Sequence, residues 1–430
     1  MKTLGIILAV LGGGSVATSF LRQFAERVEI AGGTSVKTVK IFDPTRQPGA
    51  GYAYQHDSAS NLLNTRAAGM SALQSNANHF YEWALSNQNR WKVKFPKVNM
   101  TPDAFVPRAL FGLYLNEVYD ESVSLLSKYG VIVQHIEASA TCLRMQNGRY
   151  EISTEHGRKY VADFSVLAIG NQEGMQFDYL KSNTGYFATP YPCTKITQAI
   201  ESGRSVGILG SSLSAIDAAV SLMDAGHRGK ILMISRNGRL PSVRGEHNIT
   251  RKPTLLSRTG VMDLVRARGG QLRLMEVAEF LRQEIESQDG TAIDLDMLLR
   301  ANQGPHRYLD AEIEDASVHD RIWQAVVYGL NDSIDLIWHY LPDEDRAIFE
   351  RDFKSQWLSY RVSFPLDNAL KIQKLLHSNQ LSVYGGCSDV SFNDALGQFA
   401  INVMDSTSSF TASLYTDYLI NATGYTSTVS

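Results

Sequence analysis

The chain has 430 residues, with 41 basic and 44 acidic side chains, a formal net charge of −3 and 44% hydrophobic residues. This composition is typical of a soluble globular protein and excludes a disordered, collagen-like or nucleic-acid-coating chain. Because no long basic run is present, we expect no nucleic-acid or membrane partner, and a small molecule is the expected partner. The length predicts two or more domains, each large enough to bury a cofactor.

The sequence offers neither a metal site nor a protein nucleophile of a known pattern. Cys142, Cys193 and Cys387 lie too far apart for a C-x-x-C clamp and suggest no disulfide framework, so a reducing cytoplasm is the expected compartment. No G-x-S-x-G, H-E-x-x-H or P-loop motif occurs. The chemistry is therefore expected to come from a bound cofactor.

The chain begins with the pattern of a strand, a turn, a helix and a second strand. Residues 3–11 are continuously apolar, as in a strand buried on both faces, and three glycines at 12–14 end this stretch. A helical pattern follows over 15–28, and a second apolar strand over 36–42 stops at Asp43. This βαβ unit predicts an α/β fold with a doubly wound parallel sheet.

The turn of this unit carries a dinucleotide-binding fingerprint. Gly12, Gly14 and Ala17 occupy the positions of G-x-G-x-x-G/A, and Ser15 opens the helix. Gly12 is expected to form the tight turn, Gly14 to let a pyrophosphate approach the backbone, and Ala17 to pack the helix on the strand. Asp43 is expected to accept hydrogen bonds from an adenosine ribose. The alternative is a glycine-rich turn without a ligand.

The same arrangement occurs a second time. Residues 205–209 form a short apolar strand, an Ala-rich helix follows through Met223, and a third strand covers 230–235. Ser212 stands where the fingerprint has its middle glycine, which weakens the motif taken alone. Two dinucleotide-binding domains are therefore predicted. The residues expected to contact the second dinucleotide are Gly210, Ser211, Ser212 and Ser214.

The end of the strand over 230–235 indicates which nicotinamide cofactor binds. Ser235 and Arg236 follow where NAD-binding proteins hold an acid for the ribose 2′-hydroxyl. A hydroxyl and a guanidinium suit a 2′-phosphate, so NADPH is predicted rather than NADH. The alternative is that Arg236 is a solvated surface charge.

Two further apolar strands, over 164–170 and 417–424, end in a small residue and a glycine. Such endings allow a ligand to approach the backbone, so Gly170, Thr423 and Gly424 are expected at a cofactor. The stretch from about Gly260 to Leu376 has helical spacing and is predicted to elaborate the second domain. The predicted domains are 1–190 for the first cofactor, 191–376 for the second, and 377–430 as a return to the first.

The order of these features resembles the two-dinucleotide flavoprotein superfamily, which includes the N-hydroxylating and Baeyer–Villiger monooxygenases. The resemblance implies two Rossmann-like domains, with FAD at the first site and NADPH at the second. In that superfamily further chain returns over the flavin after the Ala-Thr-Gly strand, whereas here only residues 425–430 follow. Two alternatives are therefore expected: a chain that has been shortened, or a flavin edge that is more open than usual.

More specific motifs resemble the FAD-NAD(P)-binding family that contains the aspartate N-hydroxylase (nitrosuccinate synthase) type. They lie at 49–54, 61–71, 105–108, 210–217 and 357–365, so the resemblance covers nearly the whole chain. It implies specific cofactor contacts, although the loop at 49–54 could equally be an ordinary connection. By this resemblance Asn64, Met70 and Ser71 lie beside the flavin ring, and Arg108 lies near the FAD or supports the fold of its domain.

The expected reaction follows from these cofactors. NADPH would reduce FAD, O2 would add to give a C4a-hydroperoxyflavin, and the amino group of an amino acid or small amine would attack the distal oxygen. The candidate clamp residues for a substrate carboxylate are Arg66, Arg239, Arg244 and Arg361, each of which could instead be a surface or phosphate contact. Arg244 and Arg361 are the predicted clamp among them. Two alternatives stay open: an FAD-dependent oxidase or NADPH reductase without coupled hydroxylation, and a nucleotide-binding protein without turnover. The oligomeric state is open too, a homo-oligomer included.

Overall fold

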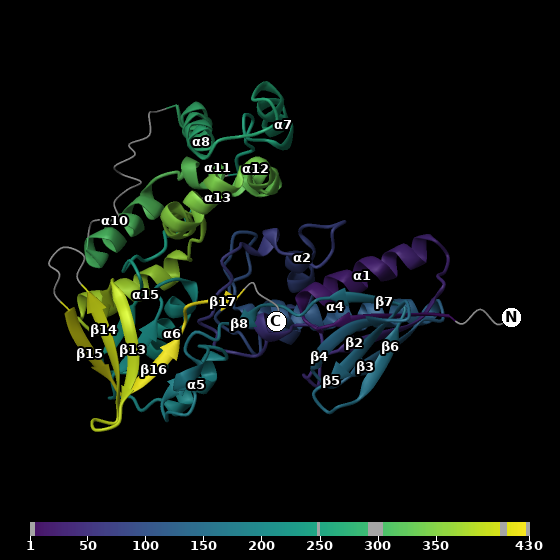
Figure 1. Cartoon of the computed structure of the whole chain (residues 1–430), viewed down its shortest axis with the longest axis horizontal. Coiled ribbons are helices and arrows are strands. Elements are labelled where there is room, and N and C mark those ends of the chain that lie inside the picture. Colours follow the sequence, from purple (N-terminus) through teal and green to yellow (C-terminus); the bar gives the residue numbers. More distant parts are fainter. Residues whose placement is uncertain (1–4, 247–249, 291–303, 405–410, 427–430) are drawn as a thin grey trace. The chain divides into compact units, whose positions relative to one another are not determined.

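The computed structural model describes residues 5–246, 250–290, 304–404 and 411–426 (Figure 1). Contacts between residues divide the chain into two compact units. Unit 1 comprises the described parts of Met1–Met175, Tyr191–Lys195 and Tyr425–Ser430, and unit 2 those of Gln176–Pro190 and Ile196–Gly424. The chain therefore enters and leaves each unit more than once.

Unit 1 is built on a parallel four-stranded sheet in the order β3-β2-β1-β7. The strand β1 lies inside the sheet and its last four residues are buried, which explains the uninterrupted apolar pattern. The first strand, helix and second strand were predicted close to their observed bounds. The bounds in this part are β1 Ile6–Leu11, α1 Ser15–Ile30, β2 Val36–Phe42, α4 Arg108–Lys128, β3 Ile132–Ile136 and β7 Phe164–Leu167.

Alternate residues of β1 face two different layers. Leu8 and Val10 belong to a core with side chains of α1 and α4. Ala9 and Leu11 belong to a second core with Ile152 and other side chains of a three-stranded antiparallel sheet. The parallel sheet is thus covered by helices on one face and by this small sheet on the other. Its strands are β4 Ala140–Gln146, β5 Arg149–Thr154 and β6 Lys159–Ala162.

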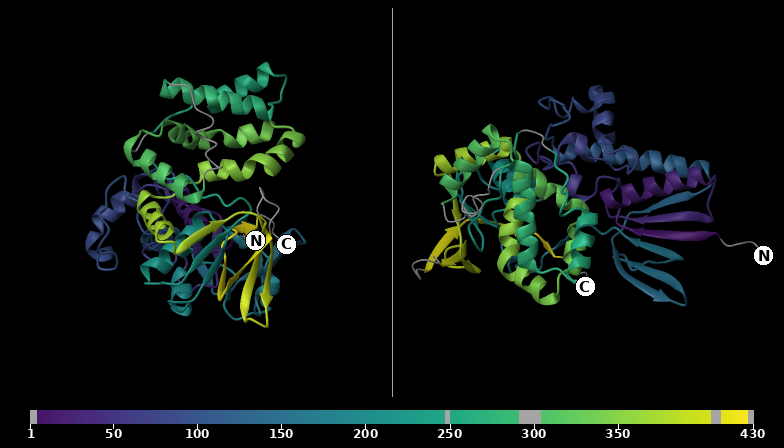
Figure 2. Two further views of the ribbon diagram at one scale, coloured as in Figure 1. Left: turned by 90° about the vertical axis from the view of Figure 1, so that its left-hand side faces the viewer. Right: turned by 90° about the horizontal axis from the view of Figure 1, so that it is seen from above.

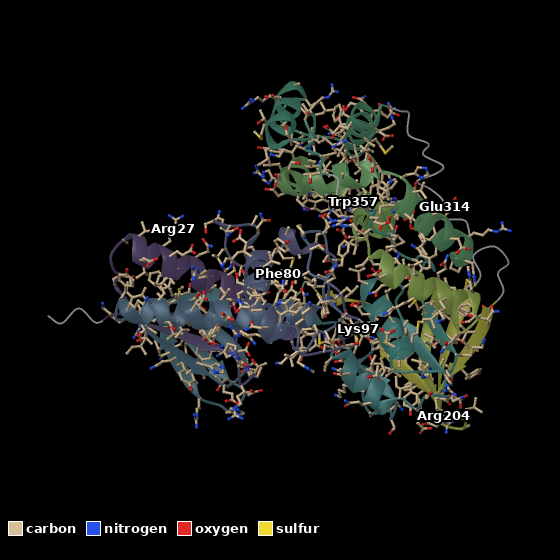
Figure 3. The ribbon with its side chains drawn as sticks, turned by 180° about the vertical axis from the view of Figure 1, so that it is seen from behind. Arg27, Phe80, Lys97, Arg204, Glu314 and Trp357 are labelled. Atoms are coloured by element: carbon tan, nitrogen blue, oxygen red, sulfur yellow. The ribbon has the colours of Figure 1, made fainter. Side chains whose placement is uncertain are left out.

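An aromatic core holds the remainder of unit 1 on α4. Phe80, Trp91 and Tyr114 are almost fully buried in this core, and Phe80 is labelled in Figure 3. The strand β17, at the end of the described chain, pairs antiparallel with β8. The other short elements of unit 1 are η1 Tyr52–Tyr54, η2 Ala67–Gly69, α2 His79–Ser86, α3 Gln88–Trp91, β8 Gln172–Glu173 and β17 Tyr425–Thr426. The helix α5 Cys193–Ala199 begins in unit 1 and ends in unit 2.

Unit 2 contains a parallel five-stranded sheet in the order β12-β11-β10-β16-β9. A three-stranded antiparallel sheet packs on it, with Phe399 and Ile401 against Leu209 and Leu419. Unit 2 therefore repeats the combination of a parallel and a small antiparallel sheet. The strands are β9 Tyr186–Phe187, β10 Val206–Leu209, β11 Ile231–Ile234, β12 Leu381–Tyr384, β13 Cys387–Asn393, β14 Gln398–Met404, β15 Thr411–Thr416 and β16 Tyr418–Asn421.

The predicted domain boundaries need three corrections. Residues 377–424 do not return to the first unit, because β12 and β16 hydrogen-bond into the sheet of β10. Residues 176–190 also lie in unit 2, where β9 pairs with β16. Residues 191–195, in contrast, belong to unit 1. From Tyr425 the described chain belongs to unit 1 again.

The helices of unit 2 include a largely helical insertion between β11 and β12, as the sequence predicted. Figure 2 shows its helices stacked in one green body. Leu256, Val261, Leu330 and Ile337 form part of its core, and α15 packs on α6. The helices are η3 Asp178–Leu180, α6 Leu213–Asp224, α7 Arg258–Ala267, α8 Leu274–Asp289, α10 Pro305–Val318, α11 Ile322–Gly329, η5 Leu330–Asp332, α12 Ile334–Tyr340, α13 Asp343–Ile348, η6 Phe349–Phe353, α14 Lys354–Arg361 and α15 Leu366–His377.

A buried histidine after α6 predicts that acid weakens the fold. His227 is buried, and burial lowers its pKa from the ordinary value of 6.5. The unfolded chain therefore takes up a proton below about pH 6.5 that the folded chain resists, so stability present above that pH is lost as the pH falls. The loss from this residue can reach about 1.4 kcal/mol per pH unit.

Urea unfolding at pH 7.5 and 5.5 tests this expectation with two variants. His227→Gln should lose less stability on acidification than the wild type, whereas His156→Gln, at an exposed histidine, should behave like the wild type. An equal acid dependence of all three proteins would contradict a role for His227.

Candidate functional site

The two predicted dinucleotide turns are each held by the same two backbone hydrogen bonds. Gly12 donates its N–H to Phe42 over 2.8 Å, and Gly210 donates to Ile234 over 2.7 Å. Ala168 donates to Leu11 over 2.8 Å, and Ala422 donates to Leu209 over the same distance. Each turn thus closes against the strand after its helix and against a neighbouring strand on the other side. The internal repeat predicted from sequence is present in atomic detail.

Both turns require glycine at their first position. Gly12 has φ +104° and Gly210 has φ +118°, which L residues rarely adopt. A Cβ on Gly12 would lie 2.1 Å from the Ala168 carbonyl oxygen, and one on Gly210 would lie 2.5 Å from that of Ala422. The small strand ends predicted at a ligand therefore also make room for the turns.

The middle position differs between the turns for a visible reason. A Cβ on Gly14 would lie 3.2 Å from the Cα of Gly51, because the loop over 49–51 crosses the first turn. At the second turn Ser212 is exposed, and its φ of −96° suits any residue. Serine is therefore tolerated there. Ala17 and Ala215, the third positions, are fully buried between helix and strand, as expected.

The starts of α1 and α6 are suited to hold phosphate groups. The first amides of a helix have no acceptor within the helix and attract anions. Within the described residues, neither Gly14 nor Ser212 caps its helix through a side chain, and neither first turn holds an acidic residue. Ser15 and Ser214 lie in these first turns and are half-buried.

Asp43 lies where predicted but binds its own turn. Its Oδ2 accepts the Gly13 N–H over 2.7 Å, and its Oδ1 accepts the Thr45 N–H over 2.9 Å and the Thr45 hydroxyl. The side chain is 7% exposed. Asp43 thus ties the first turn to the end of β2, and contact with a ribose stays a prediction.

The three residues expected beside the flavin ring differ in their exposure and in the contacts that can be described. Asn64 is exposed. Met70 is half-buried and packs against the aromatic core of unit 1. The Ser71 hydroxyl donates to the Leu73 carbonyl over 3.0 Å and accepts the Leu73 N–H over 2.9 Å, which closes a local turn. Their cofactor roles stay predictions.

Arg108 supports the fold of its domain, which is one of the two roles predicted for it. Its Nε donates to the Leu62 carbonyl over 3.1 Å, and its Nη1 donates to the Tyr191 hydroxyl over 3.0 Å. The Asp57 carboxylate, whose importance the sequence did not reveal, accepts the backbone N–H groups of Cys193 and Thr194, each over 2.9 Å. Arg108 and Asp57 therefore fasten residues 191–195 to unit 1.

The predicted strand-end residues divide between the units. Gly170 follows Ala168 in unit 1, with φ +66° and open space around it. Thr423 and Gly424 follow Ala422 beside the second turn, so they belong to unit 2, and their contact with a cofactor stays a prediction. The Thr423 hydroxyl donates to Asn421 Oδ1 over 2.7 Å.

The serines of the second site meet at the ends of β10 and β11. The Ser211 hydroxyl lies 2.9 Å from that of Ser235 and contacts the Arg239 carbonyl, and Ser235 accepts the Gly238 N–H over 2.9 Å. Arg236 is exposed, and its side chain forms no hydrogen bond or ion pair with any described residue. Its position at the surface is compatible with both predicted roles, a contact to the 2′-phosphate of NADPH and a solvated surface charge.

The two arginines predicted as a substrate clamp lie on one tyrosine. The guanidinium carbon of Arg244 is 3.7 Å from the centre of the Tyr328 ring, and that of Arg361 is 5.0 Å from it. The Tyr328 and Ser363 hydroxyls are 2.5 Å apart, and Arg361 also bonds to Asn331 Oδ1. Residues far apart in sequence thus form a cationic cluster in unit 2.

A buried ion pair holds the segment that carries Arg244. Arg321 is 5% exposed and donates to Glu312 over 2.8 Å and to Asp315 over 2.9 Å. Glu312 Oε2 in turn accepts the Ser242 hydroxyl over 2.8 Å and the Val243 N–H over 2.9 Å. No local sequence pattern indicates this network, because its members are spread over 80 positions of helix and loop.

The described parts of the chain contain neither a candidate metal site nor a candidate membrane span. No group of three or more His, Cys, Asp or Glu side chains in these parts could hold a metal ion. None of the helices in those parts has the length and apolar content needed to cross a membrane.

Comparison with known proteins gives one family match, which includes the first turn, and one relative in sequence. Residues 9–172 match the FAD-NAD(P)-binding family. The chain is also 19% identical over 432 residues to the uncharacterized protein YdhS of Escherichia coli (strain K12), an alignment that covers 90% of this chain and 78% of YdhS.

Solved structures of three enzymes have a similar fold over the whole chain. The reduced ornithine hydroxylase PvdA of Pseudomonas aeruginosa has a TM-score of 0.53 at 13% identity, with 98% of this chain and 83% of that chain covered. The L-lysine 6-monooxygenase of Pseudomonas syringae has a TM-score of 0.52 at 11% identity, with 99% of this chain and 82% of that chain covered. The FAD-bound cadaverine monooxygenase DfoA of Erwinia amylovora has a TM-score of 0.54 at 14% identity, with 100% of this chain and 80% of that chain covered.

These similarities confirm the predicted fold class of two dinucleotide-binding α/β domains with a helical elaboration. The aspartate type within the resembled family stays a prediction. Residues 9–172 match the FAD-NAD(P)-binding family, and the chain as a whole has the fold of the ornithine hydroxylase, the lysine monooxygenase and the cadaverine monooxygenase.

Proposed function

We propose that this protein is an FAD-dependent, NADPH-consuming monooxygenase that hydroxylates the amino group of an amino acid or a small amine. The observation that carries the proposal is the duplicated turn, in which Gly12 and Gly210 are held by matching hydrogen bonds beside two open helix starts. One chain therefore offers two dinucleotide sites of the same geometry. The solved relatives, which are an ornithine, a lysine and a cadaverine oxygenase, direct the choice of reaction toward amines.

The first turn fits FAD by its shape. Gly12, Gly14 and the first amides of α1 would hold the pyrophosphate, where a Cβ at either glycine would crowd the protein backbone. Asp43 fixes the Gly13 amide through Oδ2, and the remaining lone pair of that oxygen would accept a ribose hydroxyl. The chemistry that bound FAD supplies is acceptance of hydride from NADPH and activation of O2.

The cluster on Tyr328 supports a substrate that carries a carboxylate. Two guanidinium groups beside one ring can bind a carboxylate through charge-assisted hydrogen bonds, and stacking on the ring holds their planes. The buried pair of Arg321 and Glu312 fixes the backbone next to Arg244. We therefore propose Arg244 and Arg361 as substrate-binding residues and an amino acid as the preferred substrate.

The compartment and the assembly state belong to the same proposal. All three cysteines are free of disulfides, which supports a protein of the reducing cytoplasm. A homo-oligomer stays a prediction, and light scattering during gel filtration would measure it.

Flavin absorbance tests the proposed function directly. The purified protein, supplied with FAD under anaerobic conditions, should bleach much faster with NADPH than with NADH. On admission of O2, a coupled monooxygenase should convert substrate to product without accumulating hydrogen peroxide. Peroxide in place of product would indicate an oxidase, and absence of both flavin binding and bleaching would indicate a nucleotide-binding protein without turnover.

Replacing Arg361 by methionine should weaken substrate binding without removing NADPH oxidation. We expect KM for the amine substrate to rise about 10- to 100-fold, the range for loss of a charge-assisted hydrogen bond. Steady-state kinetics of coupled hydroxylation would measure the change. Arg258→Met is the matched control, because Arg258 is exposed and pairs only on the surface with Asp335 and its neighbours. An unchanged KM would rule out Arg361 as a clamp.

A further inference from the structure

Both backbone groups of Ala72 are held by side chains of the two long helices of unit 1. The Ser19 hydroxyl, in α1, donates to the Ala72 carbonyl over 2.9 Å. The Ala72 N–H donates to the hydroxyl of Tyr114, in α4, over 3.0 Å. Ser19 lies about one helical turn after Ser15, the first residue of α1. The segment 70–73 is therefore fastened close to the helix start that forms the first dinucleotide turn.

The ring of Tyr114 is held in place by packing. Its side chain is fully buried among the rings of Phe80, Trp83 and Phe111, whose centres lie 5.4, 5.6 and 5.3 Å from its own. Burial raises the pKa of its hydroxyl above the ordinary value of 10, so the hydroxyl keeps its proton at neutral pH. A buried hydroxyl of this kind needs an acceptor for that proton.

His79 supplies this acceptor. Its Nδ1 lies 2.8 Å from the Tyr114 hydroxyl, and its half-buried side chain stands at the start of α2. The Ala72 amide can only donate. The Ser71 hydroxyl, another polar neighbour of Tyr114, is engaged with both backbone groups of Leu73. The geometry therefore favours a neutral imidazole whose Nδ1 carries no proton and accepts that of the phenol.

The surroundings of His79 favour the same neutral form. Burial lowers the pKa of its imidazole from the ordinary value of 6.5, and Arg22 of α1 lowers it further. The carboxylates with the opposite effect belong to Glu121 of α4, Glu82 of α2 and Glu26 of α1. Arg22 pairs with Glu26 over 2.9 Å and with Glu121 over 3.5 Å. His79 is therefore neutral at pH 7 and takes up a proton only below about pH 6.5.

A proton on Nδ1 removes the acceptor. The imidazolium only donates, so the N–H groups of His79 and Ala72 would both face the Tyr114 oxygen, and the phenol proton would lose its partner. We propose that Tyr114 and His79 are positioning residues that hold the segment 70–73 for the flavin, and that protonation of His79 releases this hold. The inference rests on the proposed function, because residues 70 and 71 are predicted beside the flavin ring. FAD binding should therefore weaken in acid.

FAD titration of the purified chain, followed by flavin fluorescence between pH 7.5 and 5.5, tests the proposal. The wild type should lose FAD affinity about 10-fold over this range, the scale of one lost hydrogen bond in a buried place. Tyr114→Phe should bind FAD about 10-fold more weakly than the wild type at pH 7.5 and change little in acid. His79→Asn should keep the affinity of the wild type at pH 7.5 and hold it in acid, because an amide oxygen can replace Nδ1 as acceptor and does not protonate there.

Hydrogen exchange of the Ala72 amide, measured without FAD, tests the hydrogen bonds themselves. After correction for the intrinsic rate, its protection should fall about 10-fold from pH 7.5 to pH 5.5 in the wild type and stay within about twofold in His79→Asn. His156→Asn is the matched control, because His156 is an exposed histidine of the same unit, and it should follow the wild type in both measurements.

Three results would overturn the proposal. One is the same acid dependence of FAD affinity in the wild type and His79→Asn. Another is a change in Ala72 exchange without a change in FAD affinity. The third is an unaltered protection of Ala72 in Tyr114→Phe at pH 7.5.

These outcomes are separate from those of the proposed function. If FAD affinity follows His79 as expected but NADPH does not bleach the flavin, the positioning pair stands and the monooxygenase proposal fails. If coupled hydroxylation is found but FAD affinity responds to acid equally in the wild type and His79→Asn, the monooxygenase proposal stands and the positioning pair fails.

Discussion

Replacing Gly12 by alanine is expected to lower the free energy of unfolding by about 2–5 kcal/mol and to abolish FAD retention. A positive φ such as the +104° of Gly12 costs an L residue roughly 1–2 kcal/mol. The added Cβ would also lie 2.1 Å from the Ala168 oxygen, so β1 and β7 would have to separate, which adds roughly 1–3 kcal/mol. Urea unfolding, with flavin content after gel filtration, measures both effects.

Gly130→Ala separates the two causes. Gly130 also has a positive φ, of +72°, but a Cβ there meets no atom within 4 Å. We expect this variant to lose only about 1 kcal/mol and to keep its flavin. If both variants lost the same stability, the close contact between Gly12 and Ala168 would not be what demands glycine.

The first βαβ unit was predictable from sequence because all of its signals are local. Continuous apolar residues in β1, three glycines and the helical period of α1 each depend on neighbours in the chain. The position of β16 was not predictable in this way. The Ala-Thr-Gly sequence at its end resembles the Ala-Ile-Gly sequence after β7 at the first site. Only the parallel pairing of β16 with β10, in which Tyr418 lies opposite Val206, places this strand in unit 2. Nothing local distinguishes a strand that joins one parallel sheet from one that joins another.

The sites show the same division between local and distant causes. Glycine and small residues at the two turns were predictable, because backbone conformation requires them wherever such a turn forms. The role of Asp57 was not predictable, because its carboxylate accepts hydrogen bonds from two backbone amides more than 130 positions away in the sequence. The meeting of Arg244 and Arg361 on Tyr328 also depends on a bridge between Val243 and Phe364. The sequence could suggest two arginines as ligands of a substrate carboxylate, but it could not show that both contact the ring of Tyr328.

Replacing Arg321 by methionine is expected to lower the free energy of unfolding by about 3–5 kcal/mol, the cost of leaving a buried carboxylate without its partner. Glu312 is 4% exposed and would keep only the Ser242 hydroxyl and the Val243 amide as donors. The segment that carries Arg244 would loosen with it, so the substrate KM should rise as well. Arg258→Met, at an exposed pair with Asp335, should cost less than about 1 kcal/mol.

A double variant identifies the cause of this loss. Glu312→Gln combined with Arg321→Met removes the buried charge that Arg321 neutralises, so the double variant should recover part of the stability that Arg321→Met loses. Urea unfolding of the two variants and the wild type would measure the difference. A double variant no more stable than Arg321→Met would mean that Arg321 acts through its packing and not by neutralising a buried charge.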